Sequence, residues 1–298
     1  METILECCRI CPRNCKVNRL ANQIGYCGSG KNLKIARAAL HFWEEPPISG
    51  ENGSGTIFFS GCNLKCVYCQ NYEISTGGKG KEISINRFVE LCLDLQKQGA
   101  NNINLVTPTH FIPLIKKGIL MAKKKGLTLP IVYNSSGYEN VNALKQLEGI
   151  VDIYLPDFKY CDETLAVTYS KAPNYFTIAK EAIHEMFRQV GPCQVDQQGL
   201  LTKGVIVRHL LLPTHENDSK KIIKYLYQTY HDDIFISIMN QYTVTRTLPY
   251  PELNQCVTDE EYDRLIDYAL DLGITNAFIQ EGGTASESFI PNFDEFKG

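Results

Sequence analysis

Three cysteines stand close together in the chain, at Cys62, Cys66 and Cys69. Their C-x3-C-x2-C spacing follows an apolar run, so the three thiols come directly after a predicted strand. Three thiolates this close can hold one iron-sulfur cluster. A cluster of four irons then keeps one iron without a protein ligand, as catalytic zinc keeps an open position. The alternative is a structural metal knuckle or three unrelated reduced thiols, but zinc sites usually supply cysteines in pairs.

A second group of cysteines lies near the start of the chain. It comprises Cys8, Cys11 and Cys15 in C-x2-C-x3-C order, and then Cys27. Zinc suits a closed four-cysteine structural site, whereas a second iron-sulfur cluster suits three close ligands and one remote ligand. Both metals stay open at this point, and Cys7 could replace Cys8 as a ligand. The alternative is that these cysteines are small buried residues, as free cysteines often are.

Composition indicates the compartment and the class of partner. The chain has 298 residues and twelve cysteines, and residues 1–6 lack the basic start and apolar core of a secretory leader. Clustered cysteines in a reducing cytoplasm indicate metal rather than disulfides, so we expect a cytoplasmic protein. No apolar segment reaches the ~20 residues that span a bilayer, so we expect no membrane association. The net charge of -3 makes nucleic acid an unfavoured partner.

Repeated βα units must position the three cysteines. From residue 55 onward, short apolar runs alternate with longer amphipathic segments, which is typical of helices around a parallel sheet. The expected strands are residues 56–59, 103–106, 129–133, 151–155, 205–210 and 234–238. About six units are fewer than the eight of a closed barrel. The sequence therefore predicts an α/β fold, a partial (β/α)6 TIM-like barrel, preceded by a small Cys-rich segment.

Local signals place the boundaries of several elements. Ser84 is a predicted helix N-cap, and Thr258 with Glu261 forms a predicted capping box at the last helix. A long helix is expected over residues 174–189, a polar turn or hairpin over 194–203, and a turn over 281–283. Paired prolines predict an extended connection over 41–50, because proline is excluded from helix interiors. We expect two regions, the Cys-rich metal-binding segment 1–50 and the barrel domain 51–298.

Cys62, Cys66 and Cys69, after the first strand of a βα pattern, resemble the radical S-adenosylmethionine superfamily. The resemblance implies a [4Fe-4S] cluster whose open iron binds the amino and carboxylate groups of S-adenosylmethionine. It implies that one electron from the cluster cleaves this cofactor to a 5′-deoxyadenosyl radical, which removes hydrogen from a substrate. It also implies a flavodoxin- or ferredoxin-type reductant. Tyr68 matches the aromatic residue that the family places near the adenine.

Further segments resemble the pyruvate formate-lyase activating enzyme branch, most closely its PflX-type members. The stretches that carry this resemblance are residues 11–15, 44–50, 53–56 and 69–72. Thr107 and Thr109 lie where the superfamily usually carries a Gly-Gly-Glu segment that contacts the cofactor's amino group. His110 is a candidate there too, with a helix-start role as the alternative.

The resemblance also assigns later residues to cofactor binding. Asn134 and Ser135 resemble the segment that contacts the ribose and carboxylate side. Asp157 and Lys159 resemble a D-x-K element whose aspartate helps bind a monovalent cation beside the cofactor's carboxylate. Asn134 replaces a second aspartate of the activating enzymes, which weakens this cation site.

Two residues at later strand ends complete the expected cofactor site. Arg208 suits carboxylate recognition by its fork geometry, with a structural ion pair as the alternative. Met239 ends the next strand, and carboxyl ends of strands are where βα barrels bind their ligands.

The leading hypothesis is an enzyme that abstracts hydrogen from an unidentified protein, peptide or small-molecule substrate. Resemblance favours a glycine Cα of a partner enzyme, although the ferredoxin-like insert of related activating enzymes is not evident after Cys69. One alternative is a non-catalytic iron-sulfur or zinc protein for electron transfer or scaffolding. Another is a radical enzyme that modifies RNA, which the acidic balance disfavours.

Overall fold

The computed structural model describes residues 2–76, 78–280 and 293. Across these residues the strands form one ten-stranded sheet. In chain order the strands are β1 (Leu33–His41), β2 (Ser54–Phe59), β3 (Lys81–Ile83), β4 (Ile103–Val106), β5 (Ile131–Ser135), β6 (Ile153–Pro156), β7 (Gln194–Val195), β8 (Leu201–Leu210), β9 (Phe235–Met239) and β10 (Ala277–Ile279). The spatial order is β10-β9-β8-β6-β5-β4-β2-β1-β3, with β7 paired to β8.

The predicted parallel sheet is confirmed. All pairs from β2 through β4, β5, β6, β8 and β9 to β10 are parallel. Each of the six expected strands overlaps one of the observed strands, and β10 adds a parallel strand beyond them. The polar hairpin expected over residues 194–203 is confirmed as the antiparallel pair β7–β8. The turn expected over residues 281–283 lies outside the described residues.

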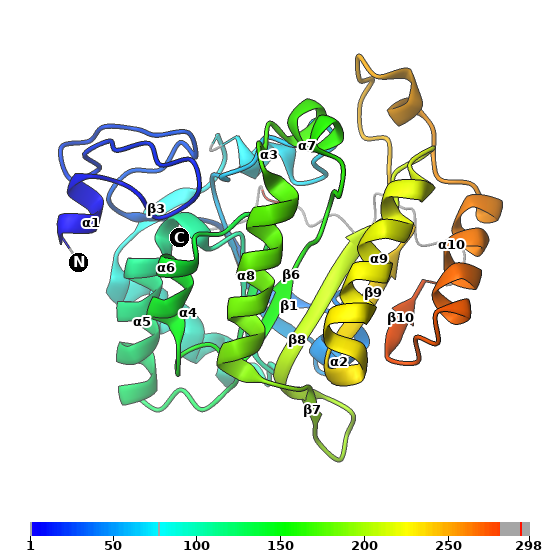
Figure 1. The fold of residues 1–298 in the computed structure, drawn as a ribbon. Helices are drawn as coiled ribbons and strands as arrows, with labels where there is room; N and C mark the ends of the chain where they lie inside the picture. The colour runs from blue at the N-terminus through cyan, green and yellow to red at the C-terminus, as the bar shows by residue number, and fades with distance from the viewer. Residues whose placement is uncertain (1, 77, 281–292, 294–298) are drawn as a thin grey trace.

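Helices connect the parallel strands. The α-helices are α1 (Glu2–Glu6), α2 (Pro46–Ser49), α3 (Tyr72–Ser75), α4 (Ile85–Lys97), α5 (Ile112–Lys124), α6 (Val141–Leu144), α7 (Glu163–Ser170), α8 (Tyr175–Val190), α9 (Glu216–Tyr230) and α10 (Asp259–Asp271). The structure also contains four short 3-10 helices among the described residues, η1 (Thr109–Phe111), η2 (Lys145–Leu147), η3 (His231–Asp233) and η4 (Pro251–Asn254). Figure 1 shows the long helices α4, α5, α8, α9 and α10 together on one face of the sheet.

Two predicted helix starts are confirmed in atomic detail. The Ser84 side chain accepts a hydrogen bond from the backbone N–H of Arg87 and caps α4. Thr258 and Glu261 form the reciprocal capping box of α10. Each cap satisfies backbone N–H groups that have no partner within the helix, which contributes about 1 kcal/mol to stability.

The extended connection predicted for residues 41–50 is wrong in its second half. Residues 46–49 form the single turn α2, with a proline at its first position. Proline is tolerated there because the first N–H groups of a helix lack partners anyway. The preceding strand β1 pairs antiparallel with β2, so part of the expected Cys-rich segment belongs to the sheet. The boundary at residue 50 stays a prediction.

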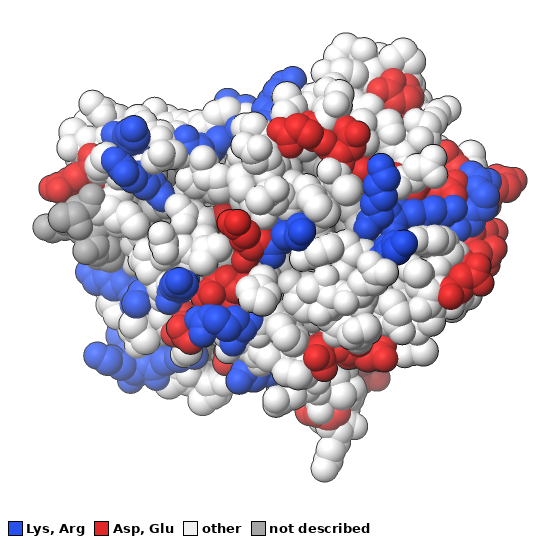
Figure 2. All heavy atoms as spheres, in the orientation of Figure 1, with Lys and Arg blue, Asp and Glu red and all other residues white. Residues whose placement is uncertain are grey.

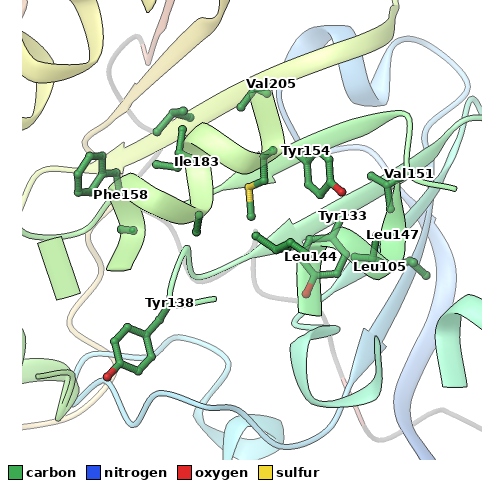
Figure 3. Close-up of a cluster of buried hydrophobic side chains, with 14 of the residues drawn as sticks. Leu105, Tyr133, Tyr138, Leu144, Leu147, Val151, Tyr154, Phe158, Ile183 and Val205 are labelled. Carbon is green, nitrogen blue, oxygen red and sulfur yellow. The ribbon is translucent and has the colours of Figure 1, made fainter. Parts of the chain in front are cut away.

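An apolar layer between the helices and the sheet holds the barrel strands in place. Figure 3 shows Tyr133 on β5 and Tyr154 on β6 beside Leu144 and Ile183 of the covering helices. The two tyrosine rings meet edge to face, with centroids 5.8 Å apart. Each fully buried large side chain contributes on the order of 1.5–3 kcal/mol to stability, so this layer holds the helices against the sheet.

On the face seen in Figure 2, charges of both signs are mixed, and no large area carries charge of one sign. There the Lys and Arg side chains are interspersed with Asp and Glu. Among the described helices, none is long and apolar enough to cross a bilayer.

Candidate active site

One cavity of about 190 Å³ lies where the parallel strands end. Loop residues after β2 line it together with residues at the carboxyl ends of β4, β5, β6, β8 and β9. The sequence-predicted residues that line it are Cys62, Cys66, Tyr68, Cys69, Thr107, Asn134, Ser135, Asp157, Lys159, Arg208 and Met239. Residues spread over almost 180 positions of sequence are thus brought to one cavity, because parallel strands deliver their carboxyl ends to the same edge.

Two of the three sulfur atoms of the cysteine loop accept hydrogen bonds. Ser170 Oγ donates to Cys66 Sγ at 2.9 Å, and the backbone N–H of Leu64 donates to Cys62 Sγ at 3.3 Å. Burial raises the pKa of the Cys62 thiol above its usual range and that of Cys66 to about 11. These thiols therefore stay protonated near neutral pH unless a cationic centre binds them, and the donated hydrogen bonds would stabilise the resulting thiolates.

Gly61 sets the direction of the cysteine loop. Its φ angle of 86° lies in the left-handed region that favours glycine. A Cβ atom at this position would lie 2.5 Å from the carbonyl oxygen of Cys27. The turn that presents Cys62 therefore packs directly on the N-terminal cysteine segment.

A row of charged residues lines the same cavity as the cysteine loop. Lys159 Nζ lies 2.7 Å from Asp157 Oδ2, and Arg208 Nη2 lies 3.0 Å from Asp157 Oδ1. Burial alone would raise the pKa of Asp157, but Lys159 and Arg208 outweigh it and hold the pKa below its ordinary value. Both oxygens of this carboxylate are thus engaged by cationic side chains.

Arg208 connects Asp157 to a buried carboxylate that sequence reasoning did not assign to the site. Arg208 Nη1 lies 3.2 Å from Glu44 Oε2, and its Nη2 donates to Asn134 Oδ1 at 2.7 Å. Asn104 and Asn134 each donate to the other oxygen of Glu44, at 3.1 and 3.3 Å. The structural ion pair considered for Arg208 is therefore present, and the same guanidinium still lines the cavity. In the sequence, the only signal of this role for Glu44 was the acidic pair Glu44-Glu45 before two prolines.

Tyr68 lies at the aromatic side of the cavity. Its hydroxyl group is 2.6 Å from the hydroxyl group of Tyr160, and its ring meets Tyr242 edge to face at 6.0 Å. Burial raises its pKa well above the ordinary value, so the hydroxyl stays neutral. The two tyrosines give the cavity an aromatic wall, in which the Tyr160 contact fixes the orientation of Tyr68.

The two threonines after β4 are placed differently. Thr107 lines the cavity with a φ angle of 57°, a conformation that is strained for a β-branched residue. Thr109 lies outside the cavity lining, where its hydroxyl donates to Glu139 Oε1 at 2.6 Å. Of the two candidate threonines, Thr107 therefore lies at the cavity and Thr109 lies in the core.

The four N-terminal cysteines line a second, smaller cavity of about 10 Å³ together with Arg19 and His110. The members of this cysteine site are Cys8, Cys11, Cys15 and Cys27. Cys7 is exposed and is not among the lining residues. Within residues 2–76, 78–280 and 293, no three potential ligands stand close enough to hold a single ion as they are, and this applies to both cysteine groups. A multinuclear cluster places its cysteines on different irons and so needs them farther apart.

Residues 56–197 match the family model described as the radical SAM superfamily. The chain is also 30% identical over 286 residues to an uncharacterized protein of Methanocaldococcus jannaschii, and the match covers 91% of this chain and 78% of that protein. The chain belongs to the radical SAM superfamily.

Solved structures support the fold of this radical SAM chain. Streptococcus suis SuiB bound to the precursor peptide SuiA superposes with a TM-score of 0.52 at 11% identity, over 79% of this chain and 51% of SuiB. SuiB bound to S-adenosylmethionine gives a TM-score of 0.51 at 10% identity, over 74% of this chain and 48% of SuiB. At this identity the likeness concerns the fold alone, and the chain spans about half the length of SuiB.

The residues of the larger cavity fit the cofactors of the radical SAM superfamily. Three thiols line it, and two of them already accept hydrogen bonds that suit thiolates. Lys159 and Arg208 line the same cavity, and their N–H groups are donors that would suit a carboxylate. Three cysteine ligands leave one iron of a [4Fe-4S] cluster for the amino and carboxylate groups of S-adenosylmethionine.

Proposed function

We propose that this chain is a radical SAM enzyme that reductively cleaves S-adenosylmethionine and abstracts a hydrogen atom from a peptide or protein. The observation that carries the proposal is the single cavity shared by Cys62, Cys66, Cys69 and the charged row at Asp157, Lys159 and Arg208. The cluster and S-adenosylmethionine would supply the one-electron cleavage and the hydrogen abstraction, as cofactors supply the difficult chemistry in such enzymes.

The chain's own residues would hold, orient and shield the reacting groups. Cys62, Cys66 and Cys69 would bind the cluster, and Lys159 would neutralise a carboxylate at the wall of the cavity. Tyr68 would give an adenine ring an aromatic neighbour. These groups are only partly buried, so a bound cofactor would exclude water from them and strengthen each electrostatic contact inside the cavity.

The substrate class remains part of the proposal. SuiB, which shares the fold, binds a precursor peptide. A glycine Cα in a partner enzyme is the specific peptide-like target that the resemblance to activating enzymes favours, and small molecules are the alternative. We propose that a flavodoxin- or ferredoxin-type protein delivers the electron, in a reducing cytoplasm suited to a chain whose twelve cysteines are all free.

Cofactor cleavage is the direct test. The protein is reconstituted anaerobically with iron and sulfide, reduced with dithionite, and mixed with S-adenosylmethionine, and 5′-deoxyadenosine is measured. We expect slow formation of the product without substrate. Faster formation with a glycyl-radical-type partner protein or peptide would support that substrate class. No product from a fully loaded cluster, with or without these additions, would favour the non-catalytic iron-sulfur alternative, whereas a rate raised only by RNA would favour an RNA-modifying enzyme.

We also propose that the N-terminal cysteine site binds a second metal. Its four cysteines line one cavity, which is the observation that supports it.

A monovalent cation at Asp157 is less favoured, because Lys159 and Arg208 already engage both carboxylate oxygens. We infer that Lys159 supplies the positive charge there. If so, replacing potassium by the bulky tetramethylammonium ion should leave the rate of cofactor cleavage unchanged.

A further inference from the structure

A chain of three hydroxyl groups ends on one sulfur atom of the cysteine loop. Ser170, the last residue of α7, is fully buried, and its Oγ donates to Cys66 Sγ at 2.9 Å. The Tyr160 hydroxyl group lies 2.7 Å from Ser170 Oγ, and the Tyr68 hydroxyl group lies 2.6 Å from that of Tyr160. This hydroxyl chain, Tyr68–Tyr160–Ser170, therefore connects the aromatic wall of the larger cavity to the Cys66 sulfur.

The donor at each step of the hydroxyl chain follows from the step at the sulfur. Ser170 has a single hydroxyl hydrogen and donates it to Cys66, so its oxygen can only accept from Tyr160. Tyr160 has then used its own hydrogen and must accept from Tyr68. All three O–H groups thus point along the chain towards Cys66. Hydroxyl groups aligned in this way polarise one another, so each bond strengthens the next.

The end of α7 holds Ser170 in a fixed place beside the cysteine loop. The last carbonyl groups of a helix have no partner within the helix. Here the Val67 N–H donates to the carbonyl oxygen of Tyr169 at 2.8 Å, and the Lys65 N–H donates to that of Ser170 at 3.4 Å. The two backbone contacts lie on either side of Cys66 in the sequence. They therefore keep its sulfur within reach of the Ser170 hydroxyl group.

Ser170 is the one side chain among the described residues that donates a hydrogen bond to a sulfur of the cysteine loop. Cys62 Sγ accepts from the backbone N–H of Leu64 instead. Hydrogen bonds to the ligand sulfurs are one of the means by which a protein sets the reduction potential of an iron-sulfur cluster. A donor stabilises the negative charge that a cluster gains on reduction, so it raises this potential.

We propose that Ser170, supported by Tyr160, raises the reduction potential of a cluster bound through Cys66. The inference rests on the function proposed above, because it needs a cluster held by the cysteine loop. Neither Ser170 nor Tyr160 is among the residues that line the larger cavity. Ser170 is therefore a positioning residue that acts through the Cys66 sulfur, and it makes the cluster easier to reduce.

A redox titration of the reconstituted full chain, without S-adenosylmethionine, tests this role. The reduced cluster is quantified by electron paramagnetic resonance at a series of applied potentials. Ser170→Ala should lower the ratio of reduced to oxidised cluster about tenfold at a given applied potential, which is a shift of about 59 mV for one electron. Tyr160→Phe should shift the potential in the same direction by less, because the bond from Ser170 to the sulfur remains.

Two further variants distinguish control of the potential from a structural role. Ser170→Thr keeps the hydroxyl group and should bring the potential back towards that of the wild type. Ser219→Ala is the matched control, because Ser219 is also buried on a helix, donates to the His215 carbonyl oxygen at 3.3 Å, and lines neither cavity. It should leave the potential unchanged. A structural role alone would lower stability or cluster content, but not the potential of the clusters that bind.

The outcomes separate this inference from the proposed function. A wild-type potential in a fully loaded Ser170→Ala variant, or an equal shift in Ser219→Ala, would overturn the role of Ser170 and leave cofactor cleavage untouched. A wild-type chain that assembles no cluster would overturn both proposals. If Ser170→Ala does not bind a cluster, Tyr160→Phe decides, and a wild-type potential in that variant would overturn the inference.

Discussion

The three cysteines of the larger cavity can be tested one residue at a time. Cys66→Ala should lower the iron content by about four atoms per chain and abolish the cluster's visible absorbance. A metal bound at the N-terminal cysteine site, as proposed above, should remain, because that site has four cysteines of its own. Cys256→Ala is the control, since Cys256 is exposed and lies outside both cavities. Loss of both metals in Cys66→Ala would mean that the two sites are not independent.

The ion pair between Arg208 and Glu44 predicts strong energetic coupling. Arg208→Met leaves Glu44 buried without its cation, which should cost about 3–5 kcal/mol in the free energy of unfolding. Combining it with Glu44→Gln should cost about 1–3 kcal/mol less than the sum of the single changes. Urea unfolding of the two single variants and the double variant measures this coupling.

An exposed pair provides the control for that double-mutant cycle. Arg188 and Glu148 lie 3.0 Å apart with 46% and 53% of their side chains exposed, so their coupling should be close to zero. Equal coupling in the two pairs would contradict the idea that Glu44 and Arg208 act as a buried unit.

Individual residues show how far the sequence could predict the cavity. The spacing of Cys62, Cys66 and Cys69 was sufficient to predict that they lie together, because all three belong to one loop. It could not separate Thr107 from Thr109, since the two side chains diverge at a backbone conformation that is rare for threonine. Glu44 was also missed, because its partner Arg208 lies on a distant strand and only the fold brings them together.

At the scale of elements, the junction between β2 and the cysteine loop depends on Gly61. Gly61→Ala should destabilise the protein by about 2–4 kcal/mol, because it combines left-handed strain with overlap against the Cys27 carbonyl group. Gly149→Ala is a matched control with a similar φ of 73°, and a Cβ atom added there would have no heavy atom within 4 Å, so this change should cost only about 1 kcal/mol.

Cluster content gives a second measure of the Gly61 change. Gly61→Ala should also bind less iron, since the loop that carries Cys62 must shift away from Cys27. Urea unfolding and iron analysis of both glycine variants check the two expectations. Equal losses in the two variants would indicate that only backbone strain matters and that the contact with Cys27 does not.

Elements with a strong local signal were predictable, and those defined by their partners were not. Ser84 and the Thr258–Glu261 pair mark helix starts by side chains that cap the backbone locally. Strand β1 carries no comparable signal, because its place is decided by pairing with β2. The turn α2 was hidden by its prolines, which are incompatible with a helix interior but acceptable at a first turn.

Over the whole molecule, buried titratable groups make stability depend on pH in two opposed directions. Burial lowers the pKa of His209 from 6.5 to about 4, so this histidine stabilises the fold above pH 6.5 and loses that contribution as pH falls towards 4. Burial raises the pKa of Glu45 and of Glu139 from 4.5 to about 7, so their contribution is present below pH 4.5 and is lost as pH rises towards 7. The two kinds of group therefore oppose each other between about pH 4.5 and 6.5, and single variants are needed to separate their contributions.

His209→Asn isolates the histidine contribution. The His209 Nδ1–H donates to the Phe158 carbonyl oxygen at 2.7 Å, and an asparagine amide can donate in its place without titrating. The asparagine variant will be less stable near pH 7.5 because it leaves a gap in the core. Its deficit should shrink by roughly 2 kcal/mol near pH 5, where the wild type has lost most of the His209 contribution. Urea unfolding at both pH values measures this change, and His184→Asn, at an exposed helix position, is the control for the exchange of a histidine for an asparagine. A constant deficit for His209→Asn would mean that the imidazole can take up a proton within the fold, and that the barrel interior near Arg208 is more accessible to water than its packing implies.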